Sequence, residues 1–321
     1  MIKNLGILTS GGDAPGMNAV IRAVVRTAIY YGLKVTGIER GYEGLINNET
    51  RQMELHSVSG IINQGGTILK TVRSAEIKTR PGQDKAIKVL KKNNIDGLIV
   101  IGGDGSLQGA LMLHKRSRIP VIGIPATIDN DVYGTDMTVG FDTAVNTAVE
   151  AIDKIRDTAT SHERTFIIEV MGRERGFLAL EVGLAAGAEI VLLPEVKYSL
   201  DNISKKLKQG SRRRKSSSII VMAEGAGNPF TIGKQIEENV GGEIRVSVLG
   251  YIQRGGKPTA CSRVLASKFG AAAVELFLKG AKAKIVAIQK NKIISLDLAV
   301  VCKHKKKLDL SSYKLEAILS I

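Results

Sequence analysis

Two short apolar segments, each followed at once by glycine or acidic residues, constrain the fold of this chain most strongly. Residues 97–101 and residues 120–125 have the length and composition of buried strands. The first leads into Gly-Gly-Asp-Gly-Ser at 102–106 and then into residues 107–114, whose apolar spacing predicts a helix. The second leads into Thr-Ile-Asp-Asn-Asp at 127–131. This order of strand, turn and helix favours an α/β fold.

The polar residues after these two strands have the chemistry of a phosphate site. Glycines let the backbone N–H groups approach an anion closely, and the start of the following helix adds partial positive charge. Asp104 is expected in the middle of the turn, where its oxygens can bind a magnesium ion. Ligands of open α/β sheets bind beyond the carboxyl ends of the strands. The two strands together therefore predict a nucleotide phosphate, a metal ion and a carboxylate base at one sheet edge.

The rest of the chain continues the alternation of strands and helices, which indicates mainly parallel sheets. Further strands are expected at residues 4–9, 34–39, 165–172, 217–226, 243–249 and 284–288. Further helices are expected at residues 17–31, 81–93, 140–161 and 261–278. Residues 41–45 are predicted to form a turn. No element is assigned beyond about residue 295, where a closing segment with a solvated basic part is expected.

Composition excludes several classes of protein. The 321 residues are 44% hydrophobic but only 4% aromatic, which is typical of an α/β protein. No apolar run reaches the roughly 20 residues that span a bilayer, and no signal peptide is recognised, so a cytoplasmic protein without a membrane partner is expected. The two cysteines, Cys261 and Cys302, are too few for a disulfide scaffold.

The formal net charge of +15 raises the question of an anionic partner. Residues 212–215 and 303–307 are strongly basic. Neither cluster contains interleaved aromatic residues, and no nucleic-acid-binding motif accompanies them. Solvated surface and sites for small phosphorylated ligands are therefore preferred over nucleic-acid binding.

Six motifs in order along the chain resemble the bacterial ATP-dependent 6-phosphofructokinases. They are LTSGGDAPGMNAVIR at 8–22, GGDGS at 102–106, PATIDND at 125–131, EVMGR at 169–173, AEGAGN at 223–228 and LGYIQRGG at 249–256. Six motifs in one order are a far more specific signal than any single glycine-rich turn.

The resemblance implies a fold and an activity. The fold would be two Rossmann-like three-layer domains with mainly parallel sheets. A large ATP-binding domain would comprise residues 1–139 and 252–302, and a smaller fructose-6-phosphate domain residues 140–251 and 303–321, with the active site in the cleft between them. The reaction would transfer the γ-phosphoryl group of MgATP to the 1-hydroxyl of fructose 6-phosphate, giving fructose 1,6-bisphosphate and ADP in glycolysis. A homotetramer would be the working form.

The resemblance also assigns roles on the ATP side. Asp129 would be the base, Thr127 would bind near the transferred phosphate, and Asp131 would assist. Arg73 would reach the transferred phosphate, a task that suits a planar guanidinium. The ATP-binding set would be Gly11, Arg73, Gly103, Asp104, Gly105 and Ser106, with Asp104 on Mg²⁺. Small residues at Gly105 and Ala126 favour ATP over pyrophosphate, whose users typically carry Asp and Lys there.

For the sugar phosphate, the resemblance assigns Met171, Gly172, Arg173, Glu224, Tyr251 and Arg254, with Arg164 and Arg245 offered by a neighbouring subunit. Arg173 is also counted among the catalytic residues. The family usually has His where this chain has Tyr251, which carries no positive charge. Phe177 and Lys70 are further departures from the family pattern.

An effector site for ADP or phosphoenolpyruvate is implied at a subunit interface. Its residues would be Arg22, Arg26, Arg156, Glu189, Arg213 and Lys215. Leu55 and Gly60 stand where some relatives carry another effector arginine and an acid.

Two alternatives remain open at this point. A kinase of another class with the GGDG turn, such as an NAD kinase, would explain the glycine turn but not the motifs at 169–173, 223–228 and 249–256. A non-catalytic phosphofructokinase relative retained for sensing would explain Tyr251, Phe177 and Lys70. Such a sensor would bind nucleotide without turning it over. The capping of the loop by Asp129 and Asp131 is the corresponding alternative at the residue level.

Overall fold

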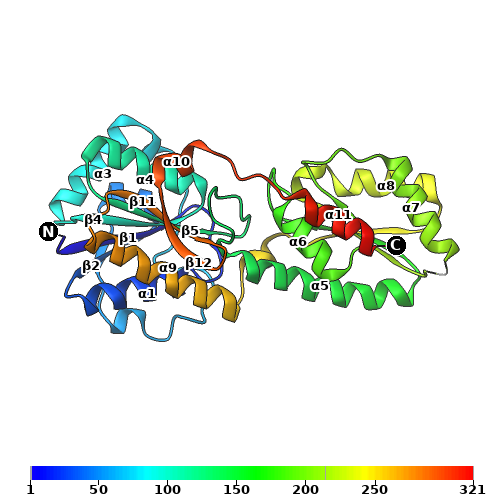
Figure 1. Ribbon diagram of the computed structural model, residues 1–321, viewed down its shortest axis with the longest axis horizontal. Helices are drawn as coiled ribbons and strands as arrows, with labels where there is room; N and C mark the ends of the chain where they lie inside the picture. The colour runs from blue at the N-terminus through cyan, green and yellow to red at the C-terminus, as the bar shows by residue number, and fades with distance from the viewer. Residues whose placement is uncertain (1, 214, 321) are drawn as a thin grey trace. The chain divides into compact units, whose positions relative to one another are not determined.

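The structure is a computed structural model that describes residues 2–213 and 215–320. The chain forms two compact units (Figure 1). Unit 1 comprises Met1–Thr143 and Arg254–Lys306, and unit 2 comprises Ala144–Gln253 and Lys307–Ile321. The chain passes from unit 1 to unit 2 within helix α5 (Phe141–Ser161). The assignment of ATP to one part of the chain and the sugar phosphate to the other stays a prediction.

Unit 1 contains a sheet whose strand order is β12-β11-β5-β4-β1-β2-β3, with β6 paired to β5. Its strands are β1 (Asn4–Ser10), β2 (Lys34–Ile38), β3 (Thr50–Gln52), β4 (Gly97–Gly102), β5 (Val121–Thr127), β6 (Val139–Gly140), β11 (Ala283–Gln289) and β12 (Lys292–Asp297). Only the edge strands β3 and β12 run antiparallel to their neighbours. The central strands β1, β4 and β5 are buried almost throughout, as both faces of a parallel sheet require.

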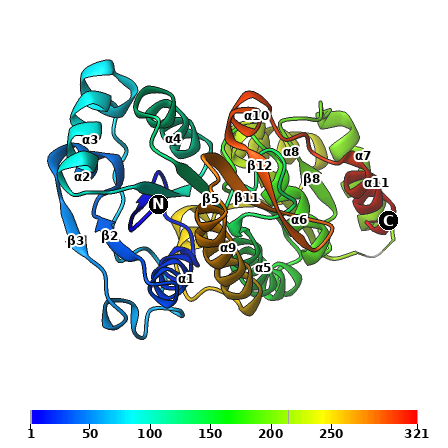
Figure 2. The same ribbon diagram turned by 60° about the vertical axis from the view of Figure 1, so that its left-hand side comes forward.

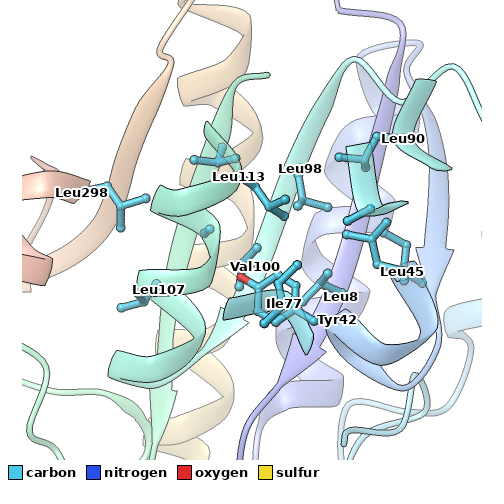
Figure 3. Close-up of a cluster of buried hydrophobic side chains, with 14 of the residues drawn as sticks. Leu8, Tyr42, Leu45, Ile77, Leu90, Leu98, Val100, Leu107, Leu113 and Leu298 are labelled. Carbon is cyan, nitrogen blue, oxygen red and sulfur yellow. The ribbon is translucent and has the colours of Figure 1, made fainter. Parts of the chain in front are cut away.

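Helices cover both faces of this sheet. Helices α1 (Met17–Tyr30) and α9 (Ala260–Leu278) lie side by side on one face, as Figure 2 shows. The other face carries α2 (Gly41–Asn47), α3 (Arg80–Lys92), α4 (Asp104–Ser117) and α10 (Leu298–Lys303). Figure 3 shows the core beneath this second group, where Leu8, Leu98 and Val100 of the sheet meet Tyr42 and Leu113 of the helices.

Unit 2 contains a four-stranded parallel sheet of order β10-β7-β9-β8. The strands are β7 (Thr165–Val170), β8 (Ile190–Leu192), β9 (Ser218–Ala223) and β10 (Ile244–Val248). Helices α7 (Leu200–Arg212) and α8 (Pro229–Val240) pack on one face. Helix α6 (Phe177–Ala186) packs on β8 and β9, and α11 (Leu310–Leu319) packs on α6.

Four short 3-10 helices complete the part of the chain that the structure describes. They are η1 (His56–Val58), η2 (Glu76–Lys78), η3 (Glu224–Ala226) and η4 (Gly250–Arg254). None of the described helices is both long enough and apolar enough to cross a membrane. The expected α/β class with two mainly parallel sheets is confirmed.

The structure corrects four expectations about local structure. Residues 41–45 were predicted to form a turn but belong to α2, and Asp104 is the first residue of α4 and not the middle of a turn. The segment beyond residue 295 contains the end of β12, α10 and α11, which the sequence analysis did not assign. The basic run at 303–307 is not wholly solvated, because Lys306 is half-buried and donates a hydrogen bond to the Asp136 carbonyl (3.1 Å).

Candidate functional site

The carboxyl ends of three neighbouring strands form one edge of the unit 1 sheet. Ser10 of β1 is in register with Gly102 of β4, and Gly102 is in register with Pro125 of β5. The glycine-rich segment after β1, the GGDGS segment after β4 and the Thr127–Asp131 segment after β5 therefore start at the same edge. Ligands of open α/β sheets bind at this edge.

Gly11 and Gly102 allow the first two segments to approach each other. Gly11 has a φ of 88°, and a Cβ there would lie 3.1 Å from the Ser106 Oγ. A Cβ on Gly102 would lie 2.4 Å from the Ser10 carbonyl oxygen. A side chain at either position would separate the segments or enter the space that a phosphate would use.

The GGDGS segment starts helix α4. Gly103 is the N-cap residue of α4. It has no side chain that could accept a hydrogen bond from the first backbone N–H groups of the helix. The Tyr42 hydroxyl, which is buried, donates a 2.6 Å hydrogen bond to the Ser106 carbonyl. Burial raises the pKa of Tyr42 well above its usual value, so the phenol remains protonated and keeps donating. Tyr42 thus fixes the first turn of α4 from α2.

Asp104 lies in the first turn of α4, where a carboxylate is favoured by the helix dipole. Its charge also acts on Cys302 of α10. Burial first, and then the Asp104 carboxylate, raise the pKa of the Cys302 thiol to about 11, whereas Lys115 opposes this rise. The described residues contain no group of three or more His, Cys, Asp or Glu side chains suited to a metal ion. A single carboxylate still fits Mg²⁺, which usually takes one or two carboxylates together with substrate phosphates.

The segment after β5 forms a closed loop of residues 128–138, called here the acidic loop. The Asn130 side chain accepts a hydrogen bond from the Thr138 N–H (3.0 Å) and donates one to the Asp136 carbonyl (3.1 Å). The Thr138 hydroxyl donates to the Thr127 carbonyl (2.6 Å). These bonds join the two ends of the loop.

Asp129 lies at the start of the acidic loop and is 7% exposed. Its backbone N–H donates a hydrogen bond to the Thr127 hydroxyl (3.2 Å). The side chain of Thr127 also lies close to Gly103. A Cβ on Gly103 would be 3.5 Å from the Thr127 Cβ, which is ordinary van der Waals contact. The structure therefore brings the GGDGS segment and the start of the acidic loop together.

Residues 67–73 run past the end of β1. Thr9 donates a hydrogen bond to the Lys70 carbonyl (2.8 Å), and Thr71 donates one to the Gly11 carbonyl (2.9 Å). Arg73 follows two residues later and is exposed. Its guanidinium is thus carried by a segment anchored on the Gly11 turn.

Arg254 also belongs to this part of unit 1. Its guanidinium forms an ion pair with Asp13, and a Cβ on Gly12 would lie 3.2 Å from its Nη2. The sequence analysis assigned Arg254 to the sugar phosphate but did not notice Asp13. Because Asp13 and Arg254 lie far apart in the sequence, no local sequence pattern indicates that they form a pair.

In unit 2, the loop after β7 meets the end of β9. The N–H of Arg173 donates a hydrogen bond to the Glu224 carboxylate (2.9 Å), and a Cβ on Gly225 would lie 2.3 Å from the Arg173 carbonyl oxygen. Gly172 has a φ of 138° and allows this turn. Burial, and then the charge of Glu224, raise the pKa of Glu169 at the end of β7. Met171, Gly172, Arg173 and Glu224 are therefore together at the carboxyl edge of the unit 2 sheet.

Gln253 supports this loop and was missed by the sequence analysis. Its side chain is fully buried and accepts a hydrogen bond from the Met171 N–H (2.9 Å). It lies between Tyr251 and Arg254 in a motif that the sequence analysis singled out. The sequence alone could not show that Gln253 has a buried structural role, whereas Tyr251 and Arg254 of the same motif were assigned to the ligand.

Arg164 and Arg245 lie at the other edge of the unit 2 sheet. Arg164 immediately precedes β7, Arg245 is the second residue of β10, and both form ion pairs with Glu243. The six residues of β7 separate Arg164 from Met171, which corresponds to roughly 20 Å. Within unit 2, these two arginines therefore do not share a site with Met171, Arg173 and Glu224.

The expected effector residues are divided between the units. Arg22 and Arg26 lie on α1 in unit 1. In unit 2, the buried Glu189 forms ion pairs with Lys215 (2.7 Å) and Arg156 (3.8 Å) and accepts a hydrogen bond from the Ile219 N–H. Arg213 is exposed just after α7. Arg214, part of the basic cluster at 212–215, lies outside the described residues.

Comparison with known proteins identifies this arrangement. The phosphofructokinase family profile matches residues 4–277. The chain belongs to the phosphofructokinase family. It is 55% identical over 320 residues to an ATP-dependent 6-phosphofructokinase of Halalkalibacterium halodurans and 53% identical over 332 residues to one of Halothermothrix orenii, with 100% of both chains covered in each case. A solved phosphofructokinase structure from Saccharomyces cerevisiae has a TM-score of 0.90 and 34% identity, over 94% of this chain and 45% of that one.

Family membership confirms the resemblance on which the sequence analysis relied. It also removes the alternative of a kinase of another class, because the match includes the sugar-phosphate motifs of unit 2 as well as the GGDGS segment.

The five residues that the sequence analysis identified as departures from the phosphofructokinase pattern have distinct surroundings. Tyr251 is 77% exposed, whereas Phe177 is buried as the first residue of α6. Lys70 has a φ of 57° and its ammonium group lies 3.9 Å from Glu39. Leu55 is exposed, and Gly60 has a φ of 68°.

Proposed function

We propose that this chain transfers the γ-phosphoryl group of MgATP to the 1-hydroxyl of fructose 6-phosphate, giving fructose 1,6-bisphosphate and ADP in glycolysis. One observation carries the proposal. The Gly11 turn, the start of α4 and the Thr127–Asp129 segment start at one sheet edge in a chain more than half identical to ATP-dependent 6-phosphofructokinases. A cytoplasmic protein fits this reaction.

On the ATP side, the turn at Gly11 and the N-terminus of α4 would bind the phosphates through backbone N–H groups. Gly103, Gly105 and Ser106 belong to this set, and a Cβ on Gly105 would enter open space, which leaves room for a nucleotide. Asp104 would hold Mg²⁺, which neutralises charge on the phosphates when bound. Arg73 would contact the transferred group, on which negative charge is spread in the transition state.

Asp129 would accept the proton of the sugar 1-hydroxyl. Thr127, whose hydroxyl already orients the Asp129 backbone, would bind next to the transferred phosphate, and Asp131 would assist. Proton removal matters less here than position, because phosphoryl transfer depends mostly on alignment and charge stabilisation.

The sugar phosphate would be held by Met171, Gly172, Arg173 and Glu224, together with Tyr251 and Arg254. Glu224 accepts the Arg173 N–H through one carboxylate oxygen, and a carboxylate has further lone pairs for sugar hydroxyls. Arg254 would exchange its Asp13 partner for the phosphate.

Arg164 and Arg245 would act on the site of a neighbouring copy. Their place at the opposite edge of the unit 2 sheet supports this, since one chain does not bring them to Glu224. The working form is therefore proposed to be a homo-oligomer, with a homotetramer by family analogy.

A regulatory site for ADP or phosphoenolpyruvate is proposed from Arg22, Arg26, Arg156, Glu189, Arg213 and Lys215. The ion pairs of Glu189 with Arg156 and Lys215 support the unit 2 part of it. An effector anion would compete with Glu189 for these cations.

The test is a coupled turnover assay of the purified protein and of Asp129→Asn with fructose 6-phosphate and either MgATP or magnesium pyrophosphate. We expect turnover with ATP alone and a fall in kcat of about 10²-fold to 10⁴-fold in the variant, the usual contribution of a general base. Nucleotide binding should be unchanged in a direct titration. Nucleotide binding by the wild type without turnover would instead support the sensing alternative.

A further inference from the structure

The basic run at 303–307 has no role in the proposed function, yet part of it contacts the acidic loop. The Lys306 ammonium group donates a hydrogen bond to the Asp136 carbonyl (3.1 Å), and His304 stacks on Tyr133 with ring centroids 5.0 Å apart. Lys306 and His304 thus approach the loop from a segment far away in the sequence. Lys303, Lys305 and Lys307 are exposed.

The β11–β12 hairpin also holds the acidic loop. The β11–β12 hairpin donates the Lys290 N–H to the Asp136 carboxylate (2.7 Å) and the Gln289 side-chain amide to the Gly134 carbonyl (2.8 Å). The Ile288 N–H donates to the Thr135 hydroxyl (3.1 Å). The acidic loop is therefore fixed by the hairpin and by Lys306, while its first residues include Asp129.

Lys306 also acts on the loop by its charge. Burial lowers the pKa of its ammonium group, and the nearby carboxylates of Asp136 and Asp131 oppose this, so that the pKa is about 8. A half-buried ammonium group interacts with such carboxylates more strongly than an exposed one. Lys306 is hence mostly charged at neutral pH beside a carboxylate two residues from Asp129.

We propose that Lys306 is a positioning residue for phosphoryl transfer, which holds the acidic loop through the Asp136 carbonyl and offsets the charge of Asp131. The inference rests on the proposed function, because it gives Lys306 its effect through Asp129. Displacement of a reacting group by about 1 Å costs as much as 10²-fold in rate. Loss of Lys306 therefore reduces kcat and leaves the binding of both substrates largely intact.

The test compares Lys306→Met, Lys306→Arg and, as a matched control from the same basic run, Lys305→Met. We expect kcat to fall about 10-fold to 100-fold in Lys306→Met, with KM for ATP and for fructose 6-phosphate changed less than about threefold. Lys305→Met should match the wild type. Lys306→Arg should recover most of the lost kcat, because arginine keeps the positive charge and the hydrogen-bond donors.

The pH dependence supplies a readout that a purely structural role would not change. The charged groups around Lys306 are Asp131 and Asp136 of the acidic loop, the hairpin residue Lys290 beside Asp136, and His304, Lys305 and Lys307 of its own segment. Since Lys306 loses its proton near pH 8 and arginine does not, the kcat of Lys306→Arg relative to the wild type should rise between pH 7 and pH 9.

Wild-type kcat in Lys306→Met, an equal loss in Lys305→Met, or no recovery in Lys306→Arg would each overturn the inference. Asp129→Asn, assayed in parallel, separates the two proposals. If Asp129→Asn is inactive while Lys306→Met is fully active, only the role of Lys306 fails. If Asp129→Asn keeps its turnover, the role of Asp129 fails as well.

Discussion

At the scale of single residues, the GGDGS segment depends on a tyrosine that the sequence analysis placed in a turn. The buried Tyr42 hydroxyl is the donor to the Ser106 carbonyl, and its ring packs where a Cβ on Gly109 would lie 2.8 Å away. Apolar periodicity and glycine spacing do not reveal such a contact, because it joins residues 64 positions apart. The place of the glycines and of Asp104 after β4 was predictable because strand, turn and helix are adjacent in the sequence, although Asp104 begins α4 and does not lie in the turn.

Removing the Tyr42 hydroxyl tests this contact. We expect Tyr42→Phe to lower the free energy of unfolding by about 1 to 2 kcal/mol, because the Ser106 carbonyl loses a buried donor. Urea denaturation of both proteins measures the difference. Tyr30→Phe, at an 82% exposed position, is the control and should change little. Equal stability of the two variants would contradict the structural role of Tyr42.

At the scale of elements, the sequence predicted the central strands of both sheets and the helices α1, α3, α4, α5 and α9, but not α2, α7, α8 or the short strands β3 and β8. Residues 41–45, which include Gly41 and Gly44, were predicted to form a turn. In α2, however, Gly44 is needed for close packing, since a Cβ there would lie 1.7 Å from the Glu39 carbonyl oxygen. The β11–β12 turn at Lys290 and Asn291 has positive φ at both residues, but it lacks the Asn-Gly or Asp-Gly pair that would have marked a two-residue hairpin in the sequence.

Helix α11 carries a buried carboxyl group that makes its packing sensitive to pH. Glu316 is 4% exposed, and its Oε1 has no hydrogen-bond partner among the residues that the structure describes. Burial raises the pKa of Glu316, and the nearby charge of Glu189 adds to this, while Lys206 and a hydrogen bond with Ser320 oppose it. A carboxyl group with a raised folded pKa stabilises the fold most below its unfolded pKa.

We therefore expect Glu316→Gln to be more stable than the wild type at neutral pH, by on the order of 1 kcal/mol. The contribution of protonated Glu316 is lost as the pH rises through its folded pKa, whereas glutamine does not titrate. The difference should shrink as the pH falls toward 4. Thermal unfolding between pH 4 and pH 8 measures it, with exposed Glu238→Gln as the control. A difference that grows on acidification would contradict this sign.

At the scale of the whole molecule, the motifs identified the family, but the sequence could not show which residues meet within one chain. Arg254 meets Asp13 across 241 positions, and Arg164 stays at the sheet edge away from Glu224. Both facts follow from strand direction and chain topology. A motif fixes residue types and local spacing, whereas the distance between two motifs depends on the sheet that carries them.

The position of Arg164 and Arg245 at the far edge of the unit 2 sheet has a genetic consequence. If each copy contributes these arginines to the active site of its neighbour, two inactive variants can complement one another in mixed oligomers. An Arg245→Ala chain keeps its own Asp129, and an Asp129→Asn chain still supplies Arg245. If the two variants mix at random, about half of the sites have an intact Asp129, and about half of those receive an intact Arg245 from the neighbouring chain. Co-expression of the two inactive variants should therefore restore about a quarter of wild-type activity. If the co-expressed variants stay as inactive as each variant alone, Arg245 does not act on the site of a neighbouring copy.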